Sequence, residues 1–221
     1  SGEKLLNEGE DQVERLGALI VDDEVLSLEM GEAFKVITAS QQYEAKAVLI
    51  ATGQQQQKVR IKNLKDYEGM GVSYCSTCDG FFYKNRKVGV LGYKDFAIHE
   101  ANELLIHTKD ITIYTNGKEI ETTEVYKDLD KQFTINTKPV EKLEGSDSLE
   151  RIVFKDGTSE ELDGIFVAYE SASGIDFARK LGIITEGNNV LVDSNQQTNI
   201  EGIFAAGDCT GGLKQIATAV G

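Results

Sequence analysis

The sequence predicts an α/β protein in which strands and helices pack as layers. Short apolar runs, typical of buried strands, alternate with segments of helical periodicity along most of the 221 residues. The clearest example is a strand–helix–strand unit, with strands at 87–92 and 111–114 and a helix at 95–107. A second buried run, at 48–51, indicates that the chain has more than one such sheet strand.

The first quarter of the chain predicts a surface helix followed by strands. Residues 3–16 space their apolar positions as an amphipathic helix does, and 18–21 form an apolar run that predicts a strand. Residues 34–38 alternate, which indicates another strand, and 48–51 is a buried one. The polar stretch 54–57 that follows predicts a crossing between two domains.

The rest of the chain continues the alternation of strands and helices. Asp95 stands where the helix at 95–107 begins and is expected to be its N-cap. Further strands are expected, in chain order, at 132–136, 151–154, 165–168, 189–193 and within 202–208, and a last helix opens near Lys214.

Composition excludes several classes of function. Apolar residues make up 40% and charged residues 27% of the chain, as in ordinary globular proteins. The net charge of −14 disfavours nucleic acid and anionic membranes as partners. No apolar run approaches the length of a membrane span. Three cysteines do not make a secreted disulfide framework, so we expect a cytoplasmic protein.

The run 71–80 carries the most specific chemistry in the sequence. Cys75 and Cys78 are separated by two residues, a spacing that allows a disulfide to close and reopen as a dithiol. Asp79 follows directly and is placed to move protons to and from the pair, although it also suits a turn before Gly80. The alternative is half of a zinc site, for which the other candidate ligands are Cys209, His99 and His107. None of these is paired at metal spacing, so we predict redox chemistry and no metal.

Three segments together resemble the low-molecular-weight thioredoxin reductase family of flavoproteins. They are 48–53, 71–82 and the pair 202–208 and 215–219, in the order and spacing of that family. The resemblance implies two Rossmann-like domains, of which the FAD domain is discontinuous. It places FAD-domain pieces at 1–57 and 164–221, and an inserted nucleotide-binding-like domain with the CxxC at 58–163.

The resemblance also implies the roles of the site residues. Cys75 is the thiol that attacks the disulfide of a thioredoxin-like protein, Cys78 is the thiol that meets the flavin, and Asp79 is the acid/base that serves the flavin–thiol step. The FAD contacts it implies are Thr52, Gly53, Gly207 and Asp208, with backbone N–H groups of Lys214, Gln215 and Ile216 near the flavin. Asp208 also suits an ordinary turn.

The nucleotide-binding turn departs from the family pattern. Gly92 and Ala97 occupy the first and third positions of Gly-x-Gly-x-x-Ala, but Lys94 replaces the middle glycine that lets a pyrophosphate approach the backbone. The stretch 114–121 also lacks the basic cluster of members that use NADPH. The chain therefore resembles more closely the ferredoxin-dependent flavin thioredoxin reductases. The opposite reading is that Lys94 itself holds a phosphate.

The start of the chain departs as well, because residues 1–57 contain no Gly-x-Gly-x-x-Gly turn. We therefore expect a fragment of a longer reductase with an incomplete FAD site. The predicted function is reduction of a thioredoxin-like protein through FAD and the Cys75/Cys78 dithiol, with ferredoxin as electron source and a homodimer as the full-length form. The alternatives are an NADPH-dependent thioredoxin reductase with a divergent nucleotide site and a non-catalytic redox switch that binds no flavin.

Overall fold

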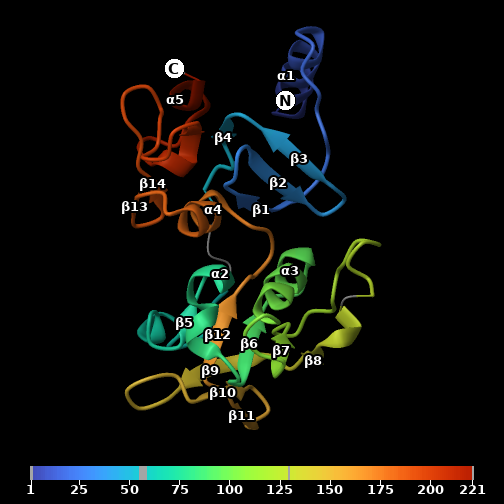
Figure 1. Cartoon of the computed structure of the whole chain (residues 1–221), viewed down its shortest axis with the longest axis vertical. Coiled ribbons are helices and arrows are strands. Elements are labelled where there is room, and N and C mark those ends of the chain that lie inside the picture. Colours follow the sequence, from blue (N-terminus) through green and yellow to red (C-terminus); the bar gives the residue numbers. More distant parts are fainter. Residues whose placement is uncertain (1, 55–58, 129, 221) are drawn as a thin grey trace.

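The computed structural model describes residues 2–54, 59–128 and 130–220. Most of the predicted domain crossing at 54–57, and with it the expected boundary between 57 and 58, lies outside the described residues. Figure 1 shows two units, and the first and last parts of the chain come together in one of them. We call residues 59–168 the middle unit, and residues 2–54 with 173–220 the flanking unit.

The middle unit is built around a parallel five-stranded sheet in the order β5-β12-β6-β7-β8. Helix α3 (Asp95–Leu104) covers one face of it, and a three-stranded antiparallel sheet covers the other. The strands of the parallel sheet are β5 (Val72–Ser73), β6 (Val88–Leu91), β7 (Ile111–Tyr114), β8 (Thr134–Asn136) and β12 (Gly164–Val167). Those of the antiparallel sheet are β9 (Val140–Glu144), β10 (Arg151–Phe154) and β11 (Ser159–Glu161).

The boundary expected at about residue 164 falls at the beginning of a strand of the middle unit. Strand β12 starts at Gly164 and pairs in parallel with both β5 and β6, so it is an inner strand of the middle sheet. The sequence placed it in the flanking piece because a buried apolar run does not reveal which sheet it joins. The return to the flanking unit follows Val167.

The flanking unit combines segments from both ends of the chain. Strand β4 (Val48–Ile50) pairs in parallel with β15 (Ile203–Ala205), with Ile50 opposite Ala205. An antiparallel meander, a hairpin and helices complete this unit, and one apolar core joins the β4–β15 pair to the meander, the hairpin and the helix at 174–181. These elements are α1 (Gly2–Arg15), β1 (Val25–Glu29), β2 (Phe34–Thr38), β3 (Gln42–Ala45), α4 (Gly174–Leu181), β13 (Thr185–Glu186), β14 (Asn189–Val190) and α5 (Ile216–Val220).

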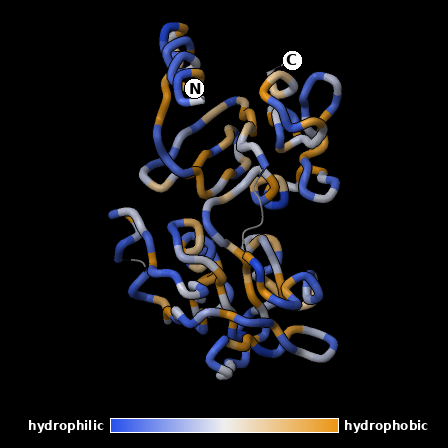
Figure 2. The backbone as a smooth tube through the Cα atoms, turned by 180° about the vertical axis from the view of Figure 1, so that it is seen from behind, coloured by the Kyte–Doolittle hydropathy of each residue, from blue (hydrophilic) through white to orange (hydrophobic). Residues whose placement is uncertain are grey.

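Helix α1 confirms the predicted surface helix, and Figure 2 shows it as mainly hydrophilic. The strand expected at 18–21 is wrong: these residues have no regular structure and are exposed, and the first strand is β1 instead. An apolar run becomes a strand only where a neighbour pairs with it, and β2 pairs with 25–29. In the described part of the chain, none of the helices combines the length and apolarity needed to cross a membrane.

The two units touch through strand β1 and helices α3 and α4. Leu26 of β1 and Ala39 are buried in the same apolar cluster as Phe96 and Ile98 of α3, which belong to the middle unit. Cross-unit packing therefore holds α3 against the flanking unit.

The short helical turns are α2 (Ser76–Asp79), η1 (Lys65–Tyr67), η2 (Gly80–Tyr83), η3 (Asp130–Gln132) and η4 (Gly207–Thr210).

Candidate functional site

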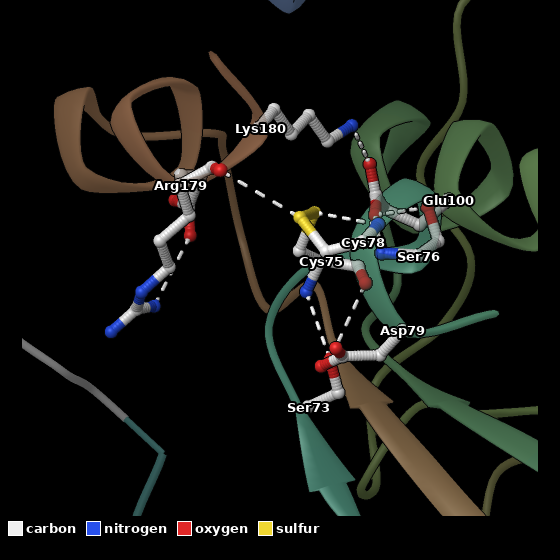
Figure 3. The surroundings of a disulfide bond; sticks show 9 residues. Ser73, Cys75, Ser76, Cys78, Asp79, Glu100, Arg179 and Lys180 are labelled. Carbon is white, nitrogen blue, oxygen red and sulfur yellow. Dashed lines mark hydrogen bonds and ion pairs between the residues drawn. A yellow bond between two sulfur atoms is a disulfide. The ribbon is translucent and has the colours of Figure 1, made fainter. Parts of the chain in front are cut away.

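The dithiol predicted at 75–78 is present as a disulfide at the start of helix α2. Cys75 is the N-cap of α2, and Cys78 lies in its first turn, so the helix itself brings the two sulfurs together. The backbone N–H of Cys78 points at the Cys75 sulfur, 3.1 Å away. The Cys75 residue is buried, with 3% of its surface exposed, whereas Cys78 is exposed. Figure 3 shows the disulfide facing helix α4 of the flanking unit.

The Asp79 side chain is held by Ser73, at the end of β5. The Ser73 hydroxyl donates to the Asp79 carboxylate at 2.6 Å and accepts from the backbone N–H of Cys75 at 3.1 Å (Figure 3). Because a hydroxyl has a single proton, the short bond to Asp79 uses it and leaves the oxygen free to accept. This arrangement fixes the orientation of the Asp79 carboxylate, one residue after Cys78.

A buried ion pair lies behind the first turn of α2. The Glu100 carboxylate of α3 accepts from the backbone N–H of Ser76 at 3.1 Å and from its hydroxyl at 2.6 Å. The other Glu100 oxygen pairs with the ammonium of Lys180, which comes from α4. The two side chains are 2% and 5% exposed. The carboxylate thus touches both the dithiol helix and the flanking unit.

Helix α4 also approaches the disulfide directly. The Cys78 sulfur lies 3.6 Å from the carbonyl oxygen of Arg179. The Arg179 guanidinium lies 4.7 Å from the centre of the Tyr74 ring, within the range of a cation–π contact. Both residues line a cavity of about 80 Å³ between the two units, which also reaches Gly53 and Cys209. The site is therefore shared by elements from both units.

The predicted FAD residues gather at one edge of the β4–β15 pair. Thr52 and Gly53 follow β4, and Gly207 and Asp208 follow β15, so parallel pairing brings the four together. Gly53 and Gly207 have φ angles of 66° and 79°, which favour glycine. A hollow here is lined by Leu49, Ala51, Gly53, Ala206, Gly207, Asp208 and Ala219. Carboxyl ends of parallel strands are where α/β sheets bind dinucleotides, so these residues fit such a group.

The remaining predicted FAD residues lie at the beginning of α5, which starts at Ile216. Lys214 hydrogen-bonds the side-chain oxygen of Gln54, which places it beside the end of β4. The Gln215 N–H donates to the Leu213 carbonyl at 2.9 Å, so it is engaged within the turn. Cys209 is buried and donates to the Ile50 carbonyl at 3.3 Å, and burial raises the pKa of its thiol. Its surroundings are those of a packed core residue.

The turn 92–97, where the family pattern has its nucleotide-binding motif, is in contact with other parts of the chain. A β-carbon on Gly92 would lie 2.1 Å from the Ala168 carbonyl oxygen, so strand and helix pack as the first glycine of the motif allows. The N-cap of α3 is Lys94, which corrects the expectation for Asp95. The Asp95 carboxylate is buried in the first turn and accepts from the Thr123 N–H at 2.9 Å. Residues 121–123 thereby lie across the start of the helix.

Histidines and metal-binding side chains contribute little to this site. Among the described residues, no group of three or more His, Cys, Asp or Glu side chains is placed to hold a metal ion. His99 is buried, and its Nε2 has no hydrogen-bond partner in the described structure. Its pKa is lowered to about 4, chiefly because burial disfavours the imidazolium and further because of the Lys180 charge.

The sequence did not indicate Ser73, Glu100, Arg179 or Lys180 as site residues. Helix α4 carries a local signal that could have revealed it: Ser173 and Asp176 form a capping box, and Gly182 ends the helix at φ 70°. The pairing of Lys180 with Glu100 has no such signal, since 80 positions separate them.

Known proteins match this chain along nearly all of its length. Residues 4–221 match the family described as pyridine nucleotide-disulphide oxidoreductase. A thioredoxin reductase from Peptoclostridium litorale is 32% identical over 239 residues, covering 99% of this chain and 75% of that protein. The crystal structure of an atypical thioredoxin reductase from Desulfovibrio vulgaris Hildenborough has a TM-score of 0.96 at 43% identity. The match covers 100% of this chain and 76% of that one. The crystal structure of a ferredoxin-flavin thioredoxin reductase from Clostridium acetobutylicum has a TM-score of 0.64 at 29% identity. The match covers 98% of this chain and 73% of that one.

Proposed function

The chain belongs to the pyridine nucleotide-disulphide oxidoreductase family and is a thioredoxin reductase-like disulfide oxidoreductase, and we propose that it carries electrons from FAD to a thioredoxin-like protein. The observation that carries this proposal is the Cys75–Cys78 disulfide on the first turn of α2, followed in the sequence by Asp79, whose carboxylate Ser73 orients. A metal site or a structural crosslink has no need of an oriented carboxylate. The relatives reported above support the same conclusion.

The two cysteines have different tasks in this proposal. Reduction of their disulfide takes two electrons and two protons, and in this proposal Asp79 exchanges a proton with the departing thiolate. The Cys75 thiolate then attacks the partner's disulfide and forms a mixed disulfide. Attack by Cys78 on the Cys75 sulfur releases the reduced partner and closes the Cys75–Cys78 bond again. Because Cys75 is only 3% exposed, its attack on a protein requires an arrangement more open than the observed one.

The exposed aromatic residues after the dithiol suit a protein substrate. Phe81 and Phe82 directly follow α2 and are 69% and 71% exposed. Their rings pack edge to face at 6.1 Å and leave an apolar surface next to Cys78 in the sequence. Such a surface is expected to contact the partner, because large exposed aromatics are enriched in protein interfaces.

FAD fits the edge formed by β4 and β15. Thr52, Gly53, Gly207 and Asp208 would hold it there, with Lys214, Gln215 and Ile216 nearby, and the bound group would supply the electrons for the dithiol. The Thr52 hydroxyl accepts from the Gly174 N–H at 3.0 Å, which connects this edge to α4 and thus to the dithiol. The same proposal includes a homodimer, which the family resemblance implies, and a cytoplasmic location, which the cysteine content favours.

We propose ferredoxin rather than NADPH as the electron donor. At the turn 92–97, the backbone of Lys94 forms an isolated parallel β-bridge with that of Glu121. The Asp95 carboxylate occupies the first turn of α3, where a pyrophosphate would otherwise meet N–H groups. The rings of Tyr93 and Tyr169 pack edge to face at 5.2 Å beside the turn. A negative charge and two rings at this place disfavour a dinucleotide. The similarity to a ferredoxin-flavin thioredoxin reductase also supports this donor.

An NADPH-dependent reductase is the second candidate, and one observation favours it. The ammonium groups of Lys94 and Lys118 lie 5.6 Å and 5.9 Å from the centre of the Tyr93 ring, so two cations stand at the turn. They are the groups that would meet a phosphate if the covering segment moved aside.

Anaerobic mixing of the FAD-loaded protein with each donor distinguishes the two candidates. Reduced ferredoxin should bleach the flavin absorbance and allow steady reduction of a thioredoxin disulfide. NADPH at millimolar concentration should do neither at a useful rate, while it bleaches an established NADPH-dependent thioredoxin reductase in parallel. Rapid bleaching by NADPH would reject the ferredoxin proposal and favour the second candidate.

A further inference from the structure

We propose that Glu100 and Lys180 are positioning residues for the dithiol, through which the flanking unit sets the charge beside helix α2. This inference rests on the proposed function only in assigning the dithiol its redox role. The carboxylate belongs to the middle unit and the ammonium to the flanking unit, so their pairing depends on how the two units meet. Figure 3 shows both groups on the side of α2 where Ser76 lies.

The first step concerns the contact between Glu100 and the dithiol helix. Its Oε2 atom accepts both the backbone N–H and the hydroxyl of Ser76, at 3.1 Å and 2.6 Å. Ser76 follows Cys75 directly, so the carboxylate fixes the peptide next to the sulfur that caps the helix. An isolated carboxylate at this position would disfavour a thiolate on Cys75, because like charges repel strongly where water is excluded.

The second step concerns the compensation of that charge. Lys180 pairs with the remaining Glu100 oxygen, and its ammonium also lies 5.9 Å from the centre of the Phe96 ring at the start of α3. Its charge is felt further along α3, since it contributes to the lowered pKa of His99. With the units together, the pair is neutral; if the units separate, Glu100 is left with its charge uncompensated. The reactivity of the dithiol therefore depends on the arrangement of the units.

Other charged groups around α2 do not reproduce this link. Asp79 lies on α2 and is bonded to Ser73 within the middle unit. Arg179 neighbours Lys180 on α4, but its guanidinium stacks on Tyr74 and lies 4.0 Å from Asp176. Glu103, on α3, is half-buried. The hydrogen bonds of the described residues include none between Glu103 and α2. The Glu100–Lys180 pair thus joins α2, α3 and α4.

The pH dependence of Cys75 alkylation tests this proposal without flavin, donor or protein substrate. In the full chain carrying Cys78→Ser, Cys75 is a free thiol, and its iodoacetamide rate is followed by peptide mass spectrometry. Lys180→Met should move the midpoint of the pH profile upward by about one unit, and Glu100→Gln should move it downward. Lys180→Arg should keep the original midpoint. As a matched control, Lys138→Met removes a surface partner of Asp156 and should leave the profile unchanged.

Opposite directions for the two substitutions are the decisive result, because a purely structural role would move both profiles the same way. If Lys180→Met does not fold, the double variant Glu100→Gln with Lys180→Met is compared with Glu100→Gln alone. The added Lys180→Met substitution should again raise the midpoint. Unchanged midpoints, or shifts of the same sign for both charges, would overturn the proposal. Failure of the chain to reduce thioredoxin would instead reject the proposed function and leave the alkylation result standing.

Discussion

Ser73→Ala should destabilise the protein much more than removal of a similar hydrogen bond at the surface. The Ser73 hydroxyl is buried, donates to Asp79 at 2.6 Å and accepts from the Cys75 N–H at 3.1 Å. Its loss leaves a buried N–H without an acceptor and a carboxylate without a donor. We expect the free energy of unfolding to fall by about 1–3 kcal/mol. Urea unfolding of the oxidised protein, followed by circular dichroism, measures this change.

Ser146→Ala is the matched control, because Ser146 also donates to a carboxylate at 2.6 Å, that of Glu150, but at an exposed site. Water replaces the lost bond there, so its effect should stay within about 0.5 kcal/mol. In the FAD-loaded enzyme Ser73→Ala should also slow thioredoxin reduction about tenfold, the cost of about 1.4 kcal/mol in the barrier. Equal destabilisation by the two substitutions would refute the reasoning that burial makes the Ser73 bond important.

Two further predictions concern the dithiol and the pH dependence of stability. In the FAD-loaded protein, Cys75→Ser should abolish thioredoxin reduction while an artificial donor still bleaches the flavin. Cys78→Ser should uncouple the flavin from the dithiol. Normal turnover by both variants would disprove the assignment. The pKa of His99 is lowered to about 4 in the folded state, against about 6.5 when unfolded, so the unfolded chain binds more protons in this window. The free energy of unfolding should therefore fall by up to about 3 kcal/mol as the pH drops from about 6.5 to about 4. Urea unfolding at several pH values should find this dependence in the control variant His107→Gln but not in His99→Gln.

The fold class and the dithiol could be predicted because both depend on neighbouring residues. The spacing of Cys75 and Cys78 allows a disulfide on one helical turn whatever the rest of the chain does, and that disulfide is present. Apolar runs at 88–91 and 111–114 are strands as expected, since their burial on both faces needs a continuous apolar sequence. The run at 18–21 was misread because its pattern is the same, yet no strand pairs with it.

The sequence by itself determined the α/β class, the closely spaced cysteine pair and the glycine-bearing ends of two strands. Only the tertiary structure decided that β12 lies inside the middle sheet, that Ser73 supports Asp79, and that Glu100 meets Lys180. The physical reason is that periodicity and spacing describe contacts along one element. Which distant side chains meet depends on how whole elements pack, and in this protein that packing joins two units around the dithiol.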